Sequence, residues 1–264
     1  MVERIGWEGL PAVLRDAVED HTGQVTASEI IAEGLNCSVA LALTTEHGRL
    51  FLKGVRDADA EAVASLRQEE RINETVGSVS PAVRHRVHGG GWSCLAFAYI
   101  EGRHADLSPG TKDLRAVAVA LRRMQEFGGP SAPVPRLADR FTPYLLPGEA
   151  EHLSGNALLH TDTNPHNIVI SRNGDAYLVD WARAATGPAW VDPACTAVRL
   201  MENGQEPTAA RAWLAGFRSW RHADPESVDA FVNVTCRHWT ATVGERGARP
   251  SNARFRHLLG SSDG

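Results

Sequence analysis

The sequence predicts an α+β fold, in which a five-stranded antiparallel sheet with one key helix precedes a mostly helical second part. Two observations carry this prediction. Short apolar runs separated by turn residues fill most of the first hundred positions, whereas apolar residues at helical spacing prevail afterwards. We therefore expect two lobes, residues 1–100 and residues 101–264, which a chain of 264 residues is long enough to form.

In the first part, apolar spacing predicts a helix over residues 8–21 and a second helix over residues 57–76. Three strands form an antiparallel meander between these helices, and two more strands follow the second one. Residues 34–38, 46–48 and 89–91 supply glycine-containing turns. The expected strands span residues 25–33, 39–43, 50–53, 83–87 and 93–100.

The second part opens with an expected helix over about residues 110–127, a Gly- and Pro-rich loop over 128–135, and short helices within 136–154. Two apolar runs then flank Arg172, Asn173 and Gly174, which is the strongest hairpin signal in the chain. The two runs span residues 168–170 and 176–179.

The C-terminal third is expected to be helical up to residue 243. Asp192 and Pro193 are typical of a helix start, with the Asp as N-cap and the Pro at the first helical position. The expected helices span residues 192–201, 207–221 and 225–243. From Gly244 onward the chain is rich in Gly, Ser and Arg, and we expect a loosely ordered tail.

Charge and composition exclude several classes of function. The formal net charge of −5 gives no general attraction to nucleic acid or to an anionic membrane. No apolar run approaches the length of a membrane span, and acidic residues near the start are untypical of a signal peptide. The four cysteines are widely spaced, so we expect reduced core residues in a cytoplasmic protein. The sequence leaves monomer and dimer open.

One segment carries chemistry. Asp162 stands five residues before Asn167, and Asp180 ends the next apolar run. An enzyme that transfers a phosphoryl group needs one carboxylate to accept the proton of the attacking hydroxyl. It also needs amide and carboxylate oxygens to hold Mg²⁺ against the nucleotide phosphates. Each residue alone could be a turn or strand-end residue, but their combined spacing favours phosphoryl transfer.

A wider set of residues occurs in the matching order: Lys53, Glu69, His160, Asp162, Asn167, Asp180 and the run 187–194. With this set the chain resembles the aminoglycoside phosphotransferase family over about residues 20–245. Members of that family are small-molecule kinases with a bilobal protein-kinase-like fold. The resemblance implies such a fold here.

The resemblance also implies roles for five residues. Asp162 would be the catalytic base, and Asn167 and Asp180 would hold Mg²⁺. Lys53, at the end of the predicted strand 50–53, would hold the nucleotide phosphates, although a lysine in such a place is otherwise a solvated edge charge. The scarcity of lysine, with only Lys53 and Lys112 in the chain, supports a functional role. Glu69 would pair with Lys53, because it shares a helix face with apolar residues, and the adjacent Glu70 is the alternative.

Two further segments would contact the nucleotide. Asn36 and Ser38 lie in the turn where the family has a nucleotide-covering loop, and backbone N–H groups there could contact phosphates. This turn has only one glycine, so an ordinary hairpin is the alternative. The backbone of Ala98 and Ile100 would face the adenine edge, because this segment resembles the connector between the family's lobes.

The chain departs from the family pattern at three places. Thr161 stands where the family commonly has Gly, and His166 stands where a small residue is common. His166 could reach the nucleotide or the acceptor, or could cap the loop. We expect His160 and Asp192 to brace the loop. The span between Phe127 and His160 is short, and in the family this region often walls the acceptor site.

The implied activity is transfer of the γ-phosphate of ATP or GTP, with Mg²⁺, to a hydroxyl of a small molecule. The resemblance suggests an antibiotic or related natural product as acceptor, hence antibiotic resistance or biosynthesis. Two alternatives stay open, namely a metabolite kinase of the choline, sugar or homoserine type and a nucleotide-binding pseudokinase regulator. A carboxylate-lined acceptor cleft would favour a cationic aminoglycoside, and a cleft without such charge would favour a metabolite kinase. No nucleic-acid or membrane partner is expected.

Overall fold

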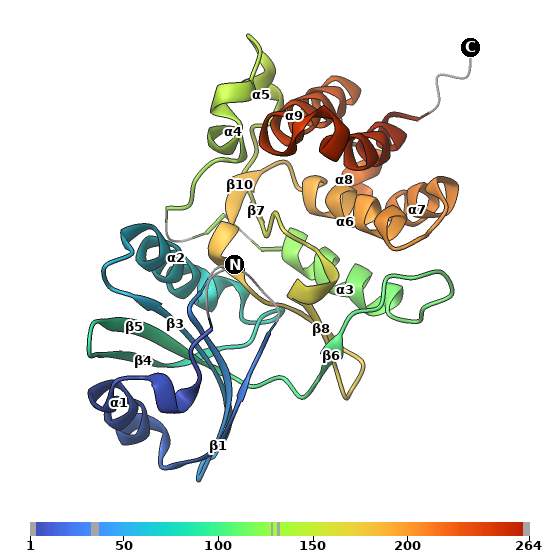
Figure 1. Cartoon of the computed structure of the whole chain (residues 1–264). Coiled ribbons are helices and arrows are strands. Elements are labelled where there is room, and N and C mark those ends of the chain that lie inside the picture. The colour runs from blue at the N-terminus through green and yellow to red at the C-terminus, as the bar shows by residue number, and fades with distance from the viewer. Residues whose placement is uncertain (1–3, 33–36, 128, 131–132, 261–264) are drawn as a thin grey trace.

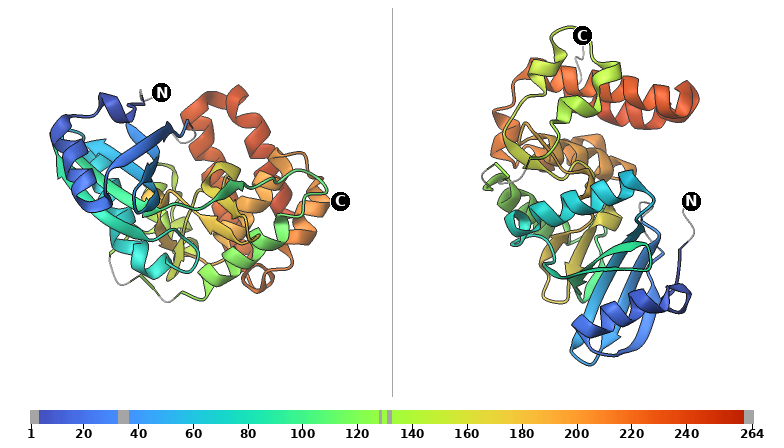
Figure 2. Two further views of the ribbon diagram at one scale, coloured as in Figure 1. Left: turned by 90° about the horizontal axis from the view of Figure 1, so that it is seen from below. Right: turned by 90° about the vertical axis from the view of Figure 1, so that its left-hand side faces the viewer.

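A computed structural model describes residues 4–32, 37–127, 129–130 and 133–260 of the chain (Figure 1). The antiparallel sheet lies at the lower left of Figure 1 and helices α6 to α9 at the upper right. Figure 2 (right) shows the blue N-terminal elements and the red helix α9 at opposite ends, with the yellow segment that includes β8 between them. The described residues thus form an N-terminal sheet lobe and a helical C-terminal lobe.

The N-terminal sheet has five strands in the order β1-β2-β3-β5-β4, and every neighbouring pair is antiparallel. This confirms the predicted sheet, although β1 ends before the expected residue 33. Because β3 lies between β2 and β5, its backbone is paired on both sides. The strands are β1 (Val25–Ile30), β2 (Val39–Thr45), β3 (Gly48–Arg56), β4 (Val83–Gly89) and β5 (Trp92–Ala98).

Successive side chains of a strand point to opposite faces of the sheet, and here both faces carry apolar residues. Helices cover both faces. The short η1 (Trp7–Gly9) and helix α1 (Ala12–Thr22) pack in one cluster with Leu41, Leu43 and Leu52. Helix α2 (Ala60–Val76) packs on the other face with Ala40 and Val55. The Asp59 side chain accepts a hydrogen bond of 2.9 Å from the N–H of Ala62 and so caps the start of α2.

The C-terminal lobe has one large core, built mainly by α3, α6, α9 and the short strands beneath them. The predicted hairpin is present, with Ile168 opposite Leu178 and Gly174 at φ 85° in its turn. The first elements are β6 (Gly102–His104), α3 (Leu114–Gln125), α4 (Leu137–Arg140), η2 (Thr142–Tyr144), α5 (Glu149–His152), β7 (Ala157–Leu159), η3 (Pro165–Asn167), β8 (Ile168–Ser171) and β9 (Ala176–Leu178). The remaining elements are η4 (Trp181–Arg183), β10 (Ala185–Gly187), α6 (Val191–Glu202), α7 (Pro207–Leu214), α8 (Arg218–Arg221), α9 (Pro225–Arg256) and η5 (His257–Leu259).

The expectation of a loosely ordered tail from Gly244 is wrong for the described residues. Helix α9 continues through a kink at Gly244 (φ 76°, ψ 163°) as far as Arg256. Ala248 and Phe255 are buried, and the Asn252 amide donates a hydrogen bond of 3.0 Å to the hydroxyl of Thr240. Tertiary packing against the first half of α9 therefore orders a segment whose composition alone predicts disorder.

The single helix expected over residues 207–221 is also wrong, because the chain breaks into α7 and α8. The break places Phe217 between the helices, where it is fully buried and lies 4.9 Å from the Trp213 ring. Trp220 consequently lies on a different helix from Trp213 and contacts Trp190, with the ring centroids 6.0 Å apart. Burial of one aromatic ring interrupts a helical pattern that continued in the sequence.

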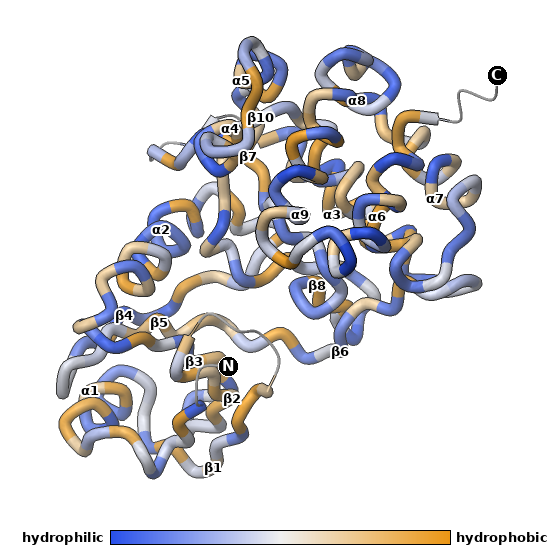
Figure 3. Tube along the Cα trace, turned by 45° about the horizontal axis from the view of Figure 1, so that its top comes forward, coloured by the Kyte–Doolittle hydropathy of each residue, from blue (hydrophilic) through white to orange (hydrophobic). Residues whose placement is uncertain are grey.

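Among the helices that the structure describes, none has the length and apolar character needed to cross a membrane. Figure 3 shows hydrophilic stretches interrupting the hydrophobic ones along α2 and α9. The cysteines are free, and three of them, Cys37, Cys94 and Cys236, are buried, as expected.

Gly102 lies just after the segment that connects the two lobes. Its lack of a side chain allows β6 to approach β8 closely. It pairs with Ser171, and a Cβ atom added here would lie 2.2 Å from the carbonyl oxygen of Ile170. We predict that Gly102→Ala lowers the free energy of unfolding by about 2 kcal/mol or more, because backbone must move to admit the methyl group.

The matched control is Gly77→Ala. Gly77 has right-handed helical torsions, and a Cβ there would make only ordinary contacts at 3.6 Å. This variant should stay within about 0.5 kcal/mol of the wild type or be slightly more stable in denaturant unfolding. Equal stability of the two variants would contradict the proposed close approach.

Candidate active site

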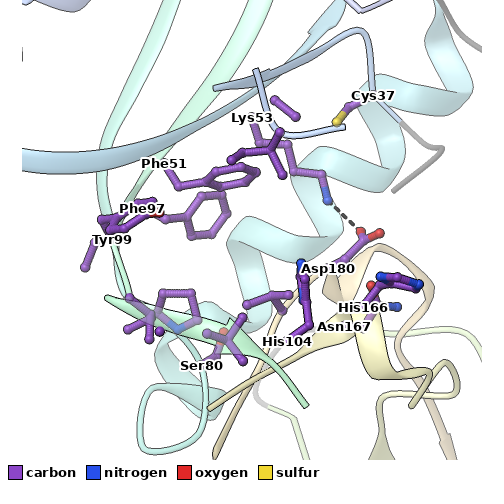
Figure 4. A pocket seen from close by; sticks show the side chains of 18 of the residues that line it. Cys37, Phe51, Lys53, Ser80, Phe97, Tyr99, His104, His166, Asn167 and Asp180 are labelled. Carbon is purple, nitrogen blue, oxygen red and sulfur yellow. Dashed lines mark hydrogen bonds and ion pairs between the residues drawn. The ribbon is translucent and has the colours of Figure 1, made fainter. Parts of the chain in front are cut away.

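Three charged side chains from both lobes meet at the inner end of a cavity. The Nζ atom of Lys53 lies 2.6 Å from Oε2 of Glu69. It also lies 2.6 Å from Oδ1 of Asp180, the contact drawn as a dashed line in Figure 4. Lys53 is only 6% exposed, which excludes a solvated edge charge. Since β3 continues to Arg56, Lys53 lies inside a central strand and not at its end, as the sequence had suggested. The strand extends beyond the predicted residue 53, since Gly54 and Val55 still pair with residues of β5.

The structure distinguishes the two glutamates of α2. Glu69 is buried and contacts Lys53, whereas the adjacent Glu70 forms an ion pair with Arg86 on β4. The second oxygen of Glu69 accepts a hydrogen bond of 3.3 Å from the N–H of Trp181. Glu69 therefore links the sheet lobe to the segment that carries Asp180.

Electrostatics keep Lys53 and Asp180 ionised, whereas burial raises the pKa of Glu69 although the nearby charge of Lys53 acts in the opposite direction. Burial alone would lower the pKa of Lys53, but the nearby carboxylates of Glu69 and Asp180 outweigh burial and raise the pKa above its ordinary value. Burial would raise the pKa of Asp180, but the positive charge and hydrogen bond of Lys53 outweigh it and lower that pKa. Lys53 and Asp180 are thus a charged pair at neutral pH.

Asp180 has an unusual backbone conformation that directs it toward Lys53. Its φ of 63° and ψ of 64° lie in the left-handed region, which non-glycine residues seldom adopt. The next residue, Trp181, is 1% exposed, and its indole N–H donates to the carbonyl of Leu178 at 3.1 Å. Strand β9 ends at Leu178, so the fixed Trp181 side chain anchors the turn that presents Asp180.

Asp192 holds the start of the loop that contains Asp162. Its two carboxylate oxygens accept hydrogen bonds from the backbone N–H groups of His160 (2.7 Å) and Thr161 (2.8 Å). Asp192 is 1% exposed, and burial raises its pKa although these hydrogen bonds and the nearby His160 act in the opposite direction. The structure thus places Asp192 as the brace that the sequence suggested. The predicted N-cap role is wrong, because α6 begins at Val191 with Trp190 as its N-cap, and Asp192 lies in the first turn.

The His160 side chain holds the same loop against the segment that leads to Asp180. Its ring is completely buried against Trp181, with the ring centroids 4.7 Å apart. Its Nε2 donates to the carbonyl of Val179 at 2.9 Å, and its Nδ1 accepts from the N–H of Asp162 at 3.3 Å. These contacts connect the loop to the strand that leads to Asp180, which is a structural role.

Thr161 occupies a position that favours glycine. Its φ of 66° lies in the left-handed region and is strained for a β-branched residue. Its hydroxyl donates a hydrogen bond of 2.7 Å to the carbonyl of Arg183, which offsets part of this cost. The departure from the family's glycine is therefore accommodated by a contact that glycine could not make.

Asp162 and Asn167 are connected directly. The Asn167 amide donates to the backbone carbonyl of Asp162 at 3.0 Å, which leaves the amide oxygen of Asn167 available. Oδ1 of Asp162 accepts from the Asn164 amide at 2.9 Å and lies 3.8 Å from the guanidinium of Arg199. Among the described residues, no donor contacts the second carboxylate oxygen of Asp162, so this oxygen can accept a proton.

The Lys53 cluster closes one end of a cavity of about 220 Å³ between the lobes. Figure 4 shows Phe51 and Phe97 on one side of this cavity, away from Asp180 and Asn167. A flat apolar slot thus leads to a charged end, which suits a base and its attached phosphates. The remaining lining residues include Ala40, Ser80, Ala98, Ile100, Val169 and Val179.

The two predicted residues of the segment that connects the lobes differ in whether their backbone N–H group is available to a ligand. Both Ala98 and Ile100 line it. The Ala98 N–H already donates to the carbonyl of Ala82 at 2.8 Å and is not available to a ligand. No acceptor in the described part of the chain contacts the Ile100 N–H, so this group is the available donor.

In the turn that was expected to cover the nucleotide, the residue that lines the cavity is not a predicted one. Asn36 lies outside the described residues. Ser38 is half-buried, its carbonyl accepts from the N–H of Ile5 at 3.0 Å, and it is not among the residues that line the cavity. Cys37 lines the cavity instead, together with Arg4, whose guanidinium lies 2.9 Å from the Cys37 sulfur. Sequence reasoning missed Arg4 because no motif marks it.

Two histidines also reach this cavity. His166 lines it, and its ring lies 5.4 Å from that of His104 on β6. The backbone N–H of His166 also donates to the Asn164 side chain at 2.9 Å, so the residue helps to shape the loop as well. No motif marks His104, and its contact with His166 could have been found only from the pairing of β6 with β8.

A second cavity of about 230 Å³ lies within the helical lobe, and Asp162 lines it. Asn167 lines the first cavity, and its amide is bonded to the Asp162 carbonyl. The Asp162–Asn167 connection therefore lies between the two cavities.

Comparison with known proteins agrees with this arrangement. Residues 150–231 match the model of the phosphotransferase enzyme family APH. This match confirms the resemblance to aminoglycoside phosphotransferases. The comparison with curated proteins found no significant match.

Solved structures share the fold across nearly the whole chain. Aminoglycoside phosphotransferase APH(4)-Ia is 13% identical with a TM-score of 0.64, covering 94% of this chain and 97% of its own. Choline kinase LicA from Streptococcus pneumoniae is 11% identical with a TM-score of 0.60, covering 94% and 98%. APH(3'')-Id from Streptomyces rimosus, in complex with ADP and streptomycin, is 17% identical with a TM-score of 0.53, covering 93% and 97%. These similarities confirm the bilobal protein-kinase-like fold.

The buried cluster makes Lys53 essential to stability. We predict that Lys53→Met lowers the free energy of unfolding by about 3–5 kcal/mol, because the buried Glu69 and the half-buried Asp180 lose their counter-charge. The double variant Lys53→Met/Glu69→Gln should recover part of this loss. Denaturant unfolding measures both.

Lys112→Met is the matched control, because Lys112 is the other lysine of the chain and is exposed. Its stability should remain within about 0.5 kcal/mol of the wild type. If Lys53→Met were as stable as this control, the cluster would not constrain the fold.

Proposed function

We propose that the protein is a small-molecule kinase that transfers the γ-phosphate of ATP or GTP to a hydroxyl group. The observation that carries this proposal is the position of Asp162 and Asn167 between two cavities, beside the buried Lys53–Asp180 pair. In this proposal residues 1–100 form the nucleotide-binding lobe and residues 101–264 form the catalytic and acceptor-binding lobe. The match to a phosphotransferase family supports the reaction class.

The nucleotide would occupy the cavity between the lobes. Phe51 and Phe97 provide apolar surface for the base, and the Ile100 N–H can donate to its edge. Lys53, held ionised by its two carboxylates, would contact the phosphates. Solved structures of APH(4)-Ia contain ADP or AMP-PNP together with hygromycin B, which supports a nucleotide as phosphoryl donor.

The donor atoms present fit Mg²⁺, a hard cation that prefers oxygen ligands. The amide oxygen of Asn167 is available because its nitrogen is bonded to the Asp162 carbonyl, and Asp180 supplies a carboxylate. These two residues would hold the ion, which when bound neutralises charge on the phosphates.

Asp162 would act as the catalytic base. Its unpartnered oxygen can accept the proton of an acceptor hydroxyl as that hydroxyl attacks the γ-phosphorus in line. Asn164 and Arg199 hold the other oxygen and so fix the orientation of the carboxylate. All of Lys53, Asp162, Asn167 and Asp180 are retained, which argues against a pseudokinase regulator.

The charges of the second cavity bear on the choice of acceptor. Its lining includes four arginines (Arg140, Arg183, Arg199 and Arg254) and two acidic residues (Asp162 and Glu202). A cationic aminoglycoside would meet an excess of like charge there. This cavity therefore favours a metabolite or a natural product without net positive charge over a cationic antibiotic.

We predict that Asp162→Asn lowers the turnover number by about 10²–10⁴-fold, because the amide cannot accept the hydroxyl proton. The dissociation constant for the nucleotide should change less than about two-fold, since Asp162 lines the other cavity. Phosphotransfer to a panel of hydroxyl compounds, measured by mass spectrometry of the products, together with nucleotide titration tests both expectations.

The control for this variant is Asp175→Asn, an exposed residue of the β8–β9 hairpin, which should retain wild-type turnover. Wild-type protein that transfers phosphate to no compound and binds no nucleotide with Mg²⁺ would disprove the kinase proposal.

A separate prediction concerns the metal. Asn167→Leu should raise the Mg²⁺ concentration required for half-maximal nucleotide binding by about ten-fold or more, because an oxygen ligand is lost. Excess EDTA should abolish the difference between this variant and the wild type. An unchanged Mg²⁺ requirement in the variant would remove Asn167 from the metal site.

A further inference from the structure

The second cavity, which Asp162 lines, combines an apolar wall with an unusual set of charges. Phe141, Phe231 and Trp239 provide aromatic surface on one part of the lining. The arginines come from distant parts of the chain, namely α4, η4, α6 and α9. Such a cavity suits a carbon skeleton that also carries a charged group.

Two of the arginines are already paired within the protein. Arg199 lies 2.6 Å from Oε2 of Glu202, and Arg254 lies 3.9 Å from Oε1 of the same carboxylate. Arg199 also lies 3.8 Å from Asp162. Glu202 and Asp162 therefore balance this half of the cavity.

The other two arginines lack such partners. Within the described part of the chain, no carboxylate oxygen lies within 4.0 Å of the guanidinium groups of Arg140 or Arg183. The nearby carboxylate of Asp192 is engaged by the N–H groups of His160 and Thr161. Burial, and then the charge of Arg183, lower the pKa of Arg140, so its positive charge is held at a cost.

The Arg140 guanidinium is connected to the catalytic loop through the backbone of Arg183, whose own side chain is exposed. The Arg183 carbonyl accepts hydrogen bonds from the Arg140 guanidinium at 2.6 Å and from the Thr161 hydroxyl at 2.7 Å. Thr161 immediately precedes Asp162. An anion that pairs with Arg140 would consequently lie in the same cavity as Asp162, and Arg183 could turn toward it.

We propose that the acceptor is a hydroxylated organic anion whose carboxylate or phosphate group pairs with Arg140 and Arg183 while its hydroxyl lies at Asp162. This inference rests on the proposed kinase function. Guanidinium groups bind the oxygens of both anion types through paired hydrogen bonds, so the shared chemistry is an anionic oxygen group. Binding would add a direct counter-charge to arginines that have no ion-pair partner within 4.0 Å among the described residues and of which Arg140 is balanced only at longer range by Asp192 and Asp162, and the aromatic wall would contact the carbon skeleton.

Four six-carbon probes of similar size test the sign of the charge: gluconate, glucose 6-phosphate, glucose and glucosamine. Binding is measured by the shift in melting temperature at constant ionic strength and with saturating ADP, which occupies the nucleotide cavity. We expect at least one of the two anions to raise the melting temperature, with no rise for glucose or glucosamine. The two anions distinguish a carboxylate from a phosphate ester.

Arg183→Gln should weaken binding of the effective anion by at least about ten-fold, the loss expected for a charge-assisted contact. Arg123→Gln, at an exposed arginine of α3 that does not line the cavity, should bind the anion like the wild type. Stabilisation by glucosamine, no stabilisation by either anion, or equal anion binding by Arg183→Gln would each overturn the proposal.

These outcomes are separable from failure of the kinase function itself. Mg²⁺-dependent nucleotide binding with preference for glucosamine would leave the kinase proposal intact and refute the anionic acceptor. Absence of nucleotide binding would refute the kinase proposal whatever the charged probes do.

Discussion

The burial of Lys53 between two carboxylates is the interaction on which the rest of the structure depends. A buried ammonium group is stable only when its charge is balanced, and Lys53 has Glu69 and Asp180 at 2.6 Å each. These groups come from β3, α2 and the turn after β9, so their contact fixes the sheet lobe against the helical lobe. Glu69 extends the connection by accepting from the N–H of Trp181. The Trp181 ring in turn packs against the His160 ring, so this chain of contacts connects the sheet to the loop that carries Asp162.

A second buried carboxylate performs a similar task with backbone partners. Asp192 binds two successive N–H groups at the start of that loop, and this pins the strained conformation of Thr161. The hydroxyl of Thr161 then binds the Arg183 carbonyl, as does the guanidinium of Arg140. The same few contacts thus position Asp162, the proposed catalytic base, and the wall of the second cavity. A change in the loop would alter both at once.

The sequence predicted the features that depend on local spacing. Asp162 and Asn167 are five residues apart in one loop, and the helical face of Leu66, Ile72 and Val76 selected Glu69 over Glu70. Features that depend on distant segments were missed. Arg140, Arg183, Arg199 and Arg254 form one cavity wall only after folding, and no spacing in the sequence connects them. The order of the chain after Gly244 likewise depends on packing against the earlier part of α9, and the burial of Phe217 divides a helix that periodicity alone continues.

The distribution of charge between the two cavities explains how one centre could join two anions. A nucleotide phosphate chain and an anionic acceptor repel each other, and the repulsion grows as they approach within a few ångströms. Lys53, together with the oxygen ligands suited to Mg²⁺, offers positive charge on the nucleotide side, while Arg140 and Arg183 offer it on the acceptor side. Each anion would then be neutralised within its own cavity. In the proposed reaction the Asp162 carboxylate, which lies 3.8 Å from Arg199, would stand at the boundary between the two cavities and would accept the hydroxyl proton.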